Sequence, residues 1–269
     1  MLKLLNTITL TKRSMGYLAR WQNIIDSEST YEAQITKAKA TWGKSNKTFD
    51  EIKKKLRQML NDTDRCAYCE DSYADEIEHI YPKSIYPEKT FVWENYLYAC
   101  GPCNGPKNSQ FALIDSVGQL QNITPPLKIP EDYVFRRPAA LQAALIDPRV
   151  ENPLQFLELD ITSTFRFVPA IGLNAQDHLR ALFTIRVLRL NDREYLVKAR
   201  EKAFENYKAR LKEYIEERNK GATQPKLDKL ISGIKEGNHQ TVWFEIKRFH
   251  SLIPELKRLF IEEPTALNW

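Results

Sequence analysis

The chain has 269 residues, of which 42% are hydrophobic and 28% charged, a composition that excludes a disordered or fibrous protein and fits a globular one. No apolar stretch approaches the roughly 20 residues that a membrane helix needs. The first ten residues also lack the pattern of a secretory signal, so we expect a cytoplasmic protein without membrane segments.

The net charge of +5 is unevenly distributed along the chain. Residues 1–65 carry 13 basic and 7 acidic side chains, whereas residues 66–110 carry 3 and 7. A basic flank beside an acidic centre suits a protein that contacts phosphates at its edge and holds a metal ion in its middle.

Residues 1–62 are expected to form an N-terminal helical region. Apolar residues recur at helical spacing in residues 30–40 and 49–60, where Ile52, Leu56 and Leu60 share one stripe. The lysines at positions 53–55 could contact nucleic acid, but the solvent-exposed face of a helix is the simpler interpretation of such a run.

Residues 63–115 are rich in Cys, Pro, Asn and Tyr, which indicates short strands and turns around a metal ion. All four cysteines lie here in two Cys-x-x-Cys pairs, Cys66/Cys69 and Cys100/Cys103, with 30 residues between the pairs. Four thiolates fill a tetrahedral shell and leave no open position, so we predict a structural Zn²⁺ ion. A redox dithiol or a disulfide is the alternative, and disulfides are disfavoured without a secretory signal.

Candidate catalytic side chains lie between and directly after the cysteine pairs. Glu78 and Asn104 can offer a carboxylate and an amide oxygen to a hard divalent ion such as Mg²⁺ or Mn²⁺, which keeps positions open for phosphate and water. On a strand, His79 would point to the face opposite Glu78, where its imidazole can act as a general base on water. Lys83 and Lys107 are candidate nucleic-acid contacts.

Other ionisable residues are given no role in this site. Glu76 is interpreted as a surface charge, and the remaining histidines, which have no motif around them, as incidental. These histidines are His178, His239 and His250.

Residues 116–269 are expected to form a mostly helical C-terminal region that binds a partner. Prolines at 125, 126 and 130 mark a connecting loop, and helices are expected to dominate from residue 141 onward, after a short strand-like piece near residues 164–168. Asn191 and Glu194 resemble a capping box, after which helical spacing continues to Tyr214. A last amphipathic segment, residues 242–260, is interrupted at Pro254.

Glu78-His79 and Asn95 lie between the cysteine pairs, and Asn104-x-x-Lys107 directly follows the second pair. This order and joint spacing resemble those of zinc-knuckle HNH endonucleases. Their fold is a β-hairpin plus one helix around a metal ion, the ββα-metal fold. The resemblance implies that Asn95 bridges backbone groups and holds the loop that carries His79, and it favours DNA over RNA as the target. Asn104 stands where many members have a second histidine.

Further stretches resemble the PtuB-type nucleases of Septu-like and retron-associated antiphage systems. They are Leu-Ile-Asp-Pro at 145–148, Glu-Asn-Pro at 151–153 and Leu-Asn-Asp-Arg-Glu-Tyr-Leu at 190–196. The resemblance implies a role in antiphage defence and an ATPase partner that gates the nuclease. Members often carry a basic residue where this chain has Tyr81.

The sequence therefore predicts a mainly α fold with a small ββα-metal (HNH) module, α+β overall. The predicted function is a metal-dependent HNH endonuclease that hydrolyses nucleic acid within a defence complex. The alternative is a catalytically idle zinc module that binds nucleic acid or scaffolds a complex.

Overall fold

The structure is a computed structural model that describes residues 1–4, 7–43, 47–60 and 63–269. Its α-helices in chain order are α1 (Lys12–Asp26), α2 (Tyr31–Trp42), α3 (Lys47–Gln58), α4 (Gly101–Lys107), α5 (Ala175–Val187), α6 (Glu194–Asn219), α7 (Gln224–Lys235), α8 (Gln240–Phe249) and α9 (Pro254–Glu262). Its strands are β1 (Glu76–His79), β2 (Tyr96–Ala99), β3 (Ala112–Ile114), β4 (Leu120–Asn122), β5 (Gln142–Ala143), β6 (Leu157–Leu159) and β7 (Phe167–Pro169).

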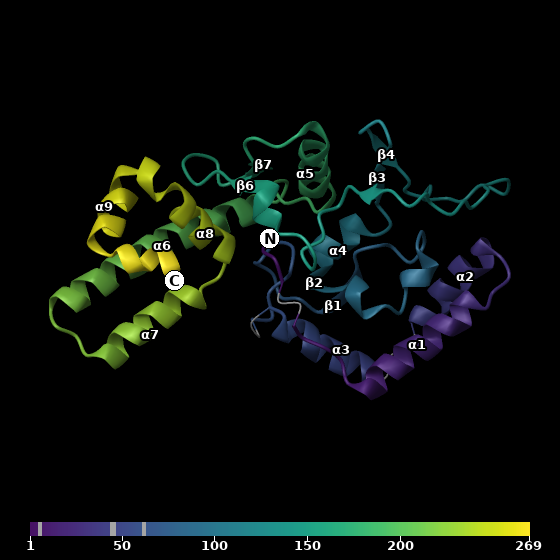
Figure 1. Cartoon of the computed structure of the whole chain (residues 1–269), viewed down its shortest axis with the longest axis horizontal. Helices are drawn as coiled ribbons and strands as arrows, with labels where there is room; N and C mark the ends of the chain where they lie inside the picture. Colours follow the sequence, from purple (N-terminus) through teal and green to yellow (C-terminus); the bar gives the residue numbers. More distant parts are fainter. Residues whose placement is uncertain (5–6, 44–46, 61–62) are drawn as a thin grey trace.

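The mainly helical α+β class predicted from the sequence is confirmed. The strands form three small antiparallel sheets, with orders β1-β2, β4-β3-β5 and β6-β7. In Figure 1 the β1-β2 hairpin and α4 lie between α1–α3 and the group formed by α6–α9. Among the described helices, none combines the length and apolar character that crossing a bilayer requires.

Two of the N-terminal helices begin at threonine caps, and the apolar side of the third is buried as its residue spacing predicts. Thr11 and Thr30 cap α1 and α2 because each side chain accepts a hydrogen bond from a backbone N–H three residues later. On α3 the expected stripe is buried at Ile52 and Leu56 and partly buried at Leu60, just past the helix. This stripe faces β2, so α3 supports one side of the hairpin.

The hairpin and the short helix after it form a compact unit. β1 pairs with β2 so that Glu78 lies opposite Leu97 and His79 opposite Tyr96. All four residues of β2 are buried, and its aromatic residues suit a strand covered on both faces. Cys100 ends the strand, Pro102 occupies the first turn of α4, and α4 then packs against β1.

The expectation that helices dominate the chain after residue 141 is confirmed by α5–α9, and β7 overlaps the strand-like piece expected at residues 164–168. Before α5, residues 141–170 form strands, turns and a 3₁₀ turn. The expected capping box is wrong. Asn191 does not cap α6: its amide accepts from the backbone N–H of Phe167 at 2.8 Å and donates to the Phe167 carbonyl at 2.7 Å. Arg193 is the N-cap residue, without a side-chain capping bond, because Asn191 is engaged by β7. The expected interruption before Pro254 is confirmed between α8 and α9.

The start of α8 contacts the turn that follows Cys69. Glu70 accepts a hydrogen bond from the backbone N–H of Thr241 at 2.9 Å, and it also contacts the Thr241 hydroxyl and the Met1 amino group. Beside it, His239 Nε2 lies 3.1 Å from Asp71 Oδ1. These contacts join the cysteine-rich segment to the C-terminal helices.

Arg149 also supports the hairpin. Its side chain is 3% exposed and donates from Nη1 to the carbonyls of Trp93 (2.6 Å) and Tyr96 (2.9 Å). Its guanidinium group also lies 4.7 Å from the centroid of the Trp93 ring. Arg149 therefore fixes the turn that leads into β2.

We expect Arg149→Met to lower the free energy of unfolding by about 2–4 kcal/mol, because it removes two buried hydrogen bonds, to the carbonyls of Trp93 and Tyr96. Urea denaturation followed by tryptophan fluorescence measures this change. Arg136→Met, which alters an exposed arginine, is the matched control and should change stability by no more than about 0.5 kcal/mol. Equal stability of the two variants would contradict the anchoring role.

Candidate metal centre and active site

The four cysteines converge on one point in the interior. All four side chains are buried, and their sulfurs lie within 4.8 Å of one another. The Cys69 and Cys100 sulfurs are 3.8 Å apart. Sulfurs at tetrahedral positions around Zn²⁺, each about 2.3 Å from the ion, would be separated by about 3.8 Å. The four cysteines therefore fit a single zinc ion that ties the segment before β1 to α4.

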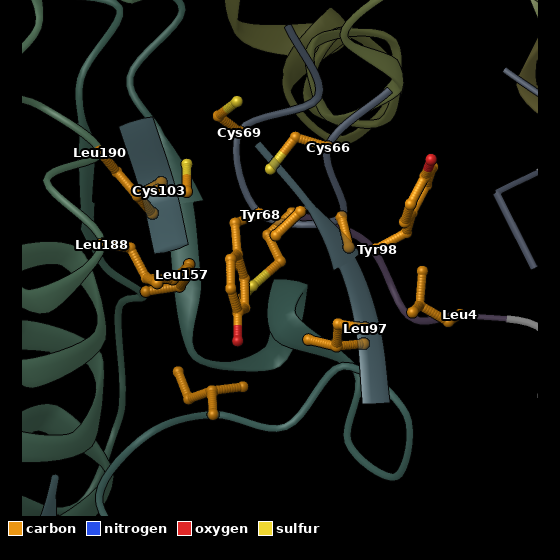
Figure 2. Close-up of a cluster of buried hydrophobic side chains, with 14 of the residues drawn as sticks. Leu4, Cys66, Tyr68, Cys69, Leu97, Tyr98, Cys103, Leu157, Leu188 and Leu190 are labelled. Atoms are coloured by element: carbon orange, nitrogen blue, oxygen red, sulfur yellow. The ribbon is translucent and has the colours of Figure 1, made fainter. Parts of the chain in front are cut away.

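The four cysteines belong to the hydrophobic core. In Figure 2 the side chains of Cys66, Cys69 and Cys103 lie together, and the Tyr68 ring extends away from them beside Leu97. Glu70 has a left-handed backbone (φ 62°), which turns the chain directly after the first cysteine pair. The second pair lies at the start of α4, where the Cys103 N–H donates to the Cys100 carbonyl at 3.0 Å.

Arg193 is a cysteine contact that the sequence analysis missed. Its Nη2 lies 3.1 Å from Cys103 Sγ, and the same nitrogen donates to the Leu188 carbonyl at 3.3 Å. Burial lowers the pKa of Arg193, but the neighbouring Cys103 sulfur outweighs it and raises the pKa overall. Four thiolates around one Zn²⁺ carry two net negative charges, so this guanidinium group offsets part of that charge. Only the three-dimensional fold brings residue 193 to this cluster.

His79 is a buried, neutral imidazole with a defined tautomer. It is 5% exposed and lies between the rings of Trp42 and Tyr96, whose centroids are 4.2 Å and 5.3 Å from its own. Its Nε2 is 3.0 Å from the Thr90 carbonyl oxygen. Because a carbonyl only accepts, Nε2 carries the proton and Nδ1 carries the free lone pair. Burial, together with the nearby Lys83 charge, lowers the pKa of His79 to about 3.

Glu78 points to the other face of β1, as strand alternation predicts, and meets α4 there. It is 4% exposed, and the ammonium nitrogen of the fully buried Lys107 lies 2.5 Å from its Oε1. The two groups therefore form a buried ion pair. Lys107 also donates to the His79 carbonyl at 2.8 Å. Burial raises the pKa of Glu78, while the Lys107 charge opposes the rise.

Asn104 lies one helical turn before Lys107, on the side of α4 that faces β1. Its Nδ2 donates to Glu76 Oε2 at 2.6 Å, so its hydrogen-bond partner is Glu76 rather than Glu78. Glu76 is exposed, as a surface charge would be, but its contact with Asn104 places it in the site. Glu76 lies two residues before Glu78 on the same strand, and this spacing could have predicted that both side chains point to the same face.

Asn95 bridges the backbone on both sides of the His79 loop. It is 3% exposed, its Oδ1 accepts from the Tyr81 N–H at 2.8 Å, and its Nδ2 donates to the carbonyls of Tyr81 (3.0 Å) and Lys89 (2.8 Å). Its own carbonyl accepts from the Ile80 N–H at 3.0 Å. The bridging contacts implied by the family resemblance are therefore present.

The two candidate phosphate contacts differ in position. Lys83 Nζ lies 5.8 Å from the centroid of the Trp42 ring, and burial lowers the pKa of Lys83. Lys107 is enclosed beside Glu78, so a phosphate contact from Lys107 would require its ammonium group to leave that carboxylate. The role of Lys107 as a phosphate contact stays a prediction.

Of the histidines outside the motif, one is not incidental. His239 contacts Asp71 next to the cysteine cluster, as described above. His178 is exposed, and His250 Nδ1 bonds the Lys247 carbonyl at 2.8 Å.

No family model matches the chain, but it is similar to a known defence-system protein. The chain is 30% identical over 113 residues to the Septu protein PtuB of Bacillus thuringiensis. The matched region is 38% of this chain and 39% of that protein, so the chain covers about two fifths of the relative's length.

We expect the purified protein to contain one zinc ion per chain, measured by inductively coupled plasma mass spectrometry. Cys100→Ser should lower the zinc content and destabilise the protein, because it removes one of four ligands. The wild-type thiols should resist alkylation until a chelator and denaturant are added. Rapid alkylation of a zinc-free protein would instead support the redox alternative.

Asn95→Ala removes three hydrogen bonds to buried backbone and should lower the free energy of unfolding by about 2–4 kcal/mol. Because Asn95 lies away from the sulfurs, the zinc content should stay at the wild-type value. Chemical denaturation and metal analysis on the same preparation test both statements. Asn23→Ala, which alters an exposed residue of α1, is the control and should change neither.

Proposed function

We propose that this chain is a metal-dependent endonuclease of the HNH type that hydrolyses phosphodiester bonds, with DNA favoured over RNA. The observation that carries the proposal is the placement of Glu78 and His79 on opposite faces of one strand. This strand is clamped by the cysteine cluster, and α4 brings Asn104 to its Glu78 side. The strand then offers a metal ligand on one face and a general base on the other.

Glu78 and Asn104 would hold a Mg²⁺ or Mn²⁺ ion, since carboxylate and amide oxygens are ligands that hard ions prefer. The donor set fits a hard cation, because Glu78 offers a carboxylate and Asn104 an amide oxygen on the same side of β1. The Lys107 ammonium group lies beside Glu78 Oε1 and would have to move aside when the ion binds. When bound, such an ion supplies positive charge to the phosphate and lowers the pKa of water. Ni²⁺ and Zn²⁺ should support the reaction poorly, because they favour nitrogen and sulfur ligands.

The protein's own groups supply the proton transfer and the positioning. His79 is neutral and accepts the proton of the attacking water at Nδ1, while its Nε2–H bond to Thr90 keeps the ring in one orientation. Asn95 holds the loop that follows His79. Lys83, beside Trp42 and near the Glu78 carboxylate, can contact the phosphate.

The match to a Septu protein supports a place in an antiphage defence system. We propose that the chain is the nuclease component of a complex whose second component is an ATPase. The helices α5–α9 would provide the surface for that partner.

The second candidate function is a catalytically idle zinc module that binds nucleic acid or scaffolds a complex. Two features of the same site favour it. His79 is only 5% exposed beneath Trp42, and Lys107 already neutralises Glu78.

The decisive experiment measures cleavage of DNA and RNA by purified protein in Mg²⁺, with and without any partner that co-purifies. His79→Ala and His79→Gln should each reduce the cleavage rate by about 100-fold or more, because a general base contributes at least that factor. His79→Gln retains a donor that can reach the Thr90 carbonyl. A loss of cleavage in this variant would therefore not be explained by loss of that hydrogen bond. His178→Ala, at an exposed histidine, should cleave like the wild type.

Two results would contradict the proposal. Cleavage that persists in both His79 variants would remove His79 as the base. A folded, zinc-containing wild-type protein that cleaves no substrate in Mg²⁺ or Mn²⁺, even with its partner, would favour the idle module.

A further inference from the structure

We propose that Glu76 is a positioning residue that sets the orientation of the Asn104 amide, so that the amide oxygen faces the ion held with Glu78. This inference rests on the proposed nuclease function. Strand periodicity places the Glu76 carboxylate on the same face as Glu78. In this proposal Glu76 orients a metal ligand and does not bind the ion itself.

The strand and the helix place two pairs of side chains side by side. Glu76 and Glu78 are two residues apart on β1, so both point to the same face of the hairpin. Asn104 and Lys107 are three residues apart on α4 and therefore share one face of that helix. Asn104 meets Glu76 at 2.6 Å, and Lys107 meets Glu78 at 2.5 Å.

The hydrogen bond to Glu76 selects one of the two amide orientations. An ionised carboxylate can only accept, so the NH₂ group of Asn104 must face Glu76. The Oδ1 atom then occupies the other branch of the amide and points away from Glu76. Only this oxygen can ligate a hard cation, because the NH₂ group is a donor without a free lone pair. Without Glu76, rotation of the amide by about 180° would present NH₂ to the ion.

The backbone of α4 leaves room for this contact. A Cβ atom at Gly101 would lie 3.3 Å from Glu76 Oε1, closer than most such contacts, so a side chain here would crowd the carboxylate. Glu76 itself is exposed and belongs to no part of the hydrophobic core. Its hydrogen bond to Asn104 therefore has no evident function in packing.

A double-mutant cycle tests the proposal through Mn²⁺ affinity, measured on zinc-loaded protein from the electron paramagnetic resonance signal of free Mn²⁺. Glu76→Ala should weaken Mn²⁺ binding about tenfold or more, as loss of a group that orients a metal ligand does. High Mn²⁺ should restore its cleavage rate. Asp75→Ala removes the same charge from the adjacent exposed residue and should bind Mn²⁺ like the wild type.

The second half of the cycle uses Asn104→Asp. A carboxylate presents an oxygen to the ion in either orientation, so Glu76 has nothing left to orient. In this background Glu76→Ala should leave Mn²⁺ affinity unchanged or increase it, because it removes a like charge. An equal loss of affinity in both backgrounds would show that Glu76 acts on the ion directly, which would overturn the positioning role.

The outcomes also separate this inference from the proposed function. If the zinc-loaded wild type neither binds Mn²⁺ nor cleaves nucleic acid, the proposed function fails. If the wild type does both while Glu76→Ala binds Mn²⁺ with wild-type affinity, only the role of Glu76 fails.

Discussion

The convergence of four cysteine sulfurs is the constraint on which the rest of the site depends. Strands of four residues and a helix of seven cannot bury enough apolar surface to hold their own geometry. The cysteine pairs fix the two ends of this unit, since one precedes β1 and the other begins α4. Once the start of α4 is fixed, helical periodicity determines that Asn104 and Lys107 face β1.

Buried charge around this hairpin is neutralised by groups from distant segments. Lys107 lies against Glu78, and Arg193 lies against Cys103. An unpaired charge in such an interior is costly, whereas a pair with good geometry is tolerated. The site can therefore remain folded before any ion or substrate arrives, with its charges balanced by the chain's own cations.

The sequence predicted those features that depend on local spacing. Two Cys-x-x-Cys pairs, the alternation of Glu78 and His79 along a strand, and the apolar stripe of α3 follow from periodicities of two to four residues. It could not predict contacts whose partners are remote. Asn191 has the sequence pattern of a helix cap, but its side-chain amide forms two hydrogen bonds with the backbone of Phe167 in β7. His239 lacks a motif because its partner, Asp71, is 168 residues earlier in the chain.

The contacts between α8 and the turn after Cys69 also bear on how the chain is synthesised. They join residues separated by 168 and 171 positions, so they form only after residues 239–241 have left the ribosome. Closing so long a loop is entropically costly and slow. The turn after the first cysteine pair thus reaches its final packing only after residues 239–241 have been synthesised. A nascent chain therefore carries an incompletely supported module, and its maturation is coupled to the folding of the C-terminal helices.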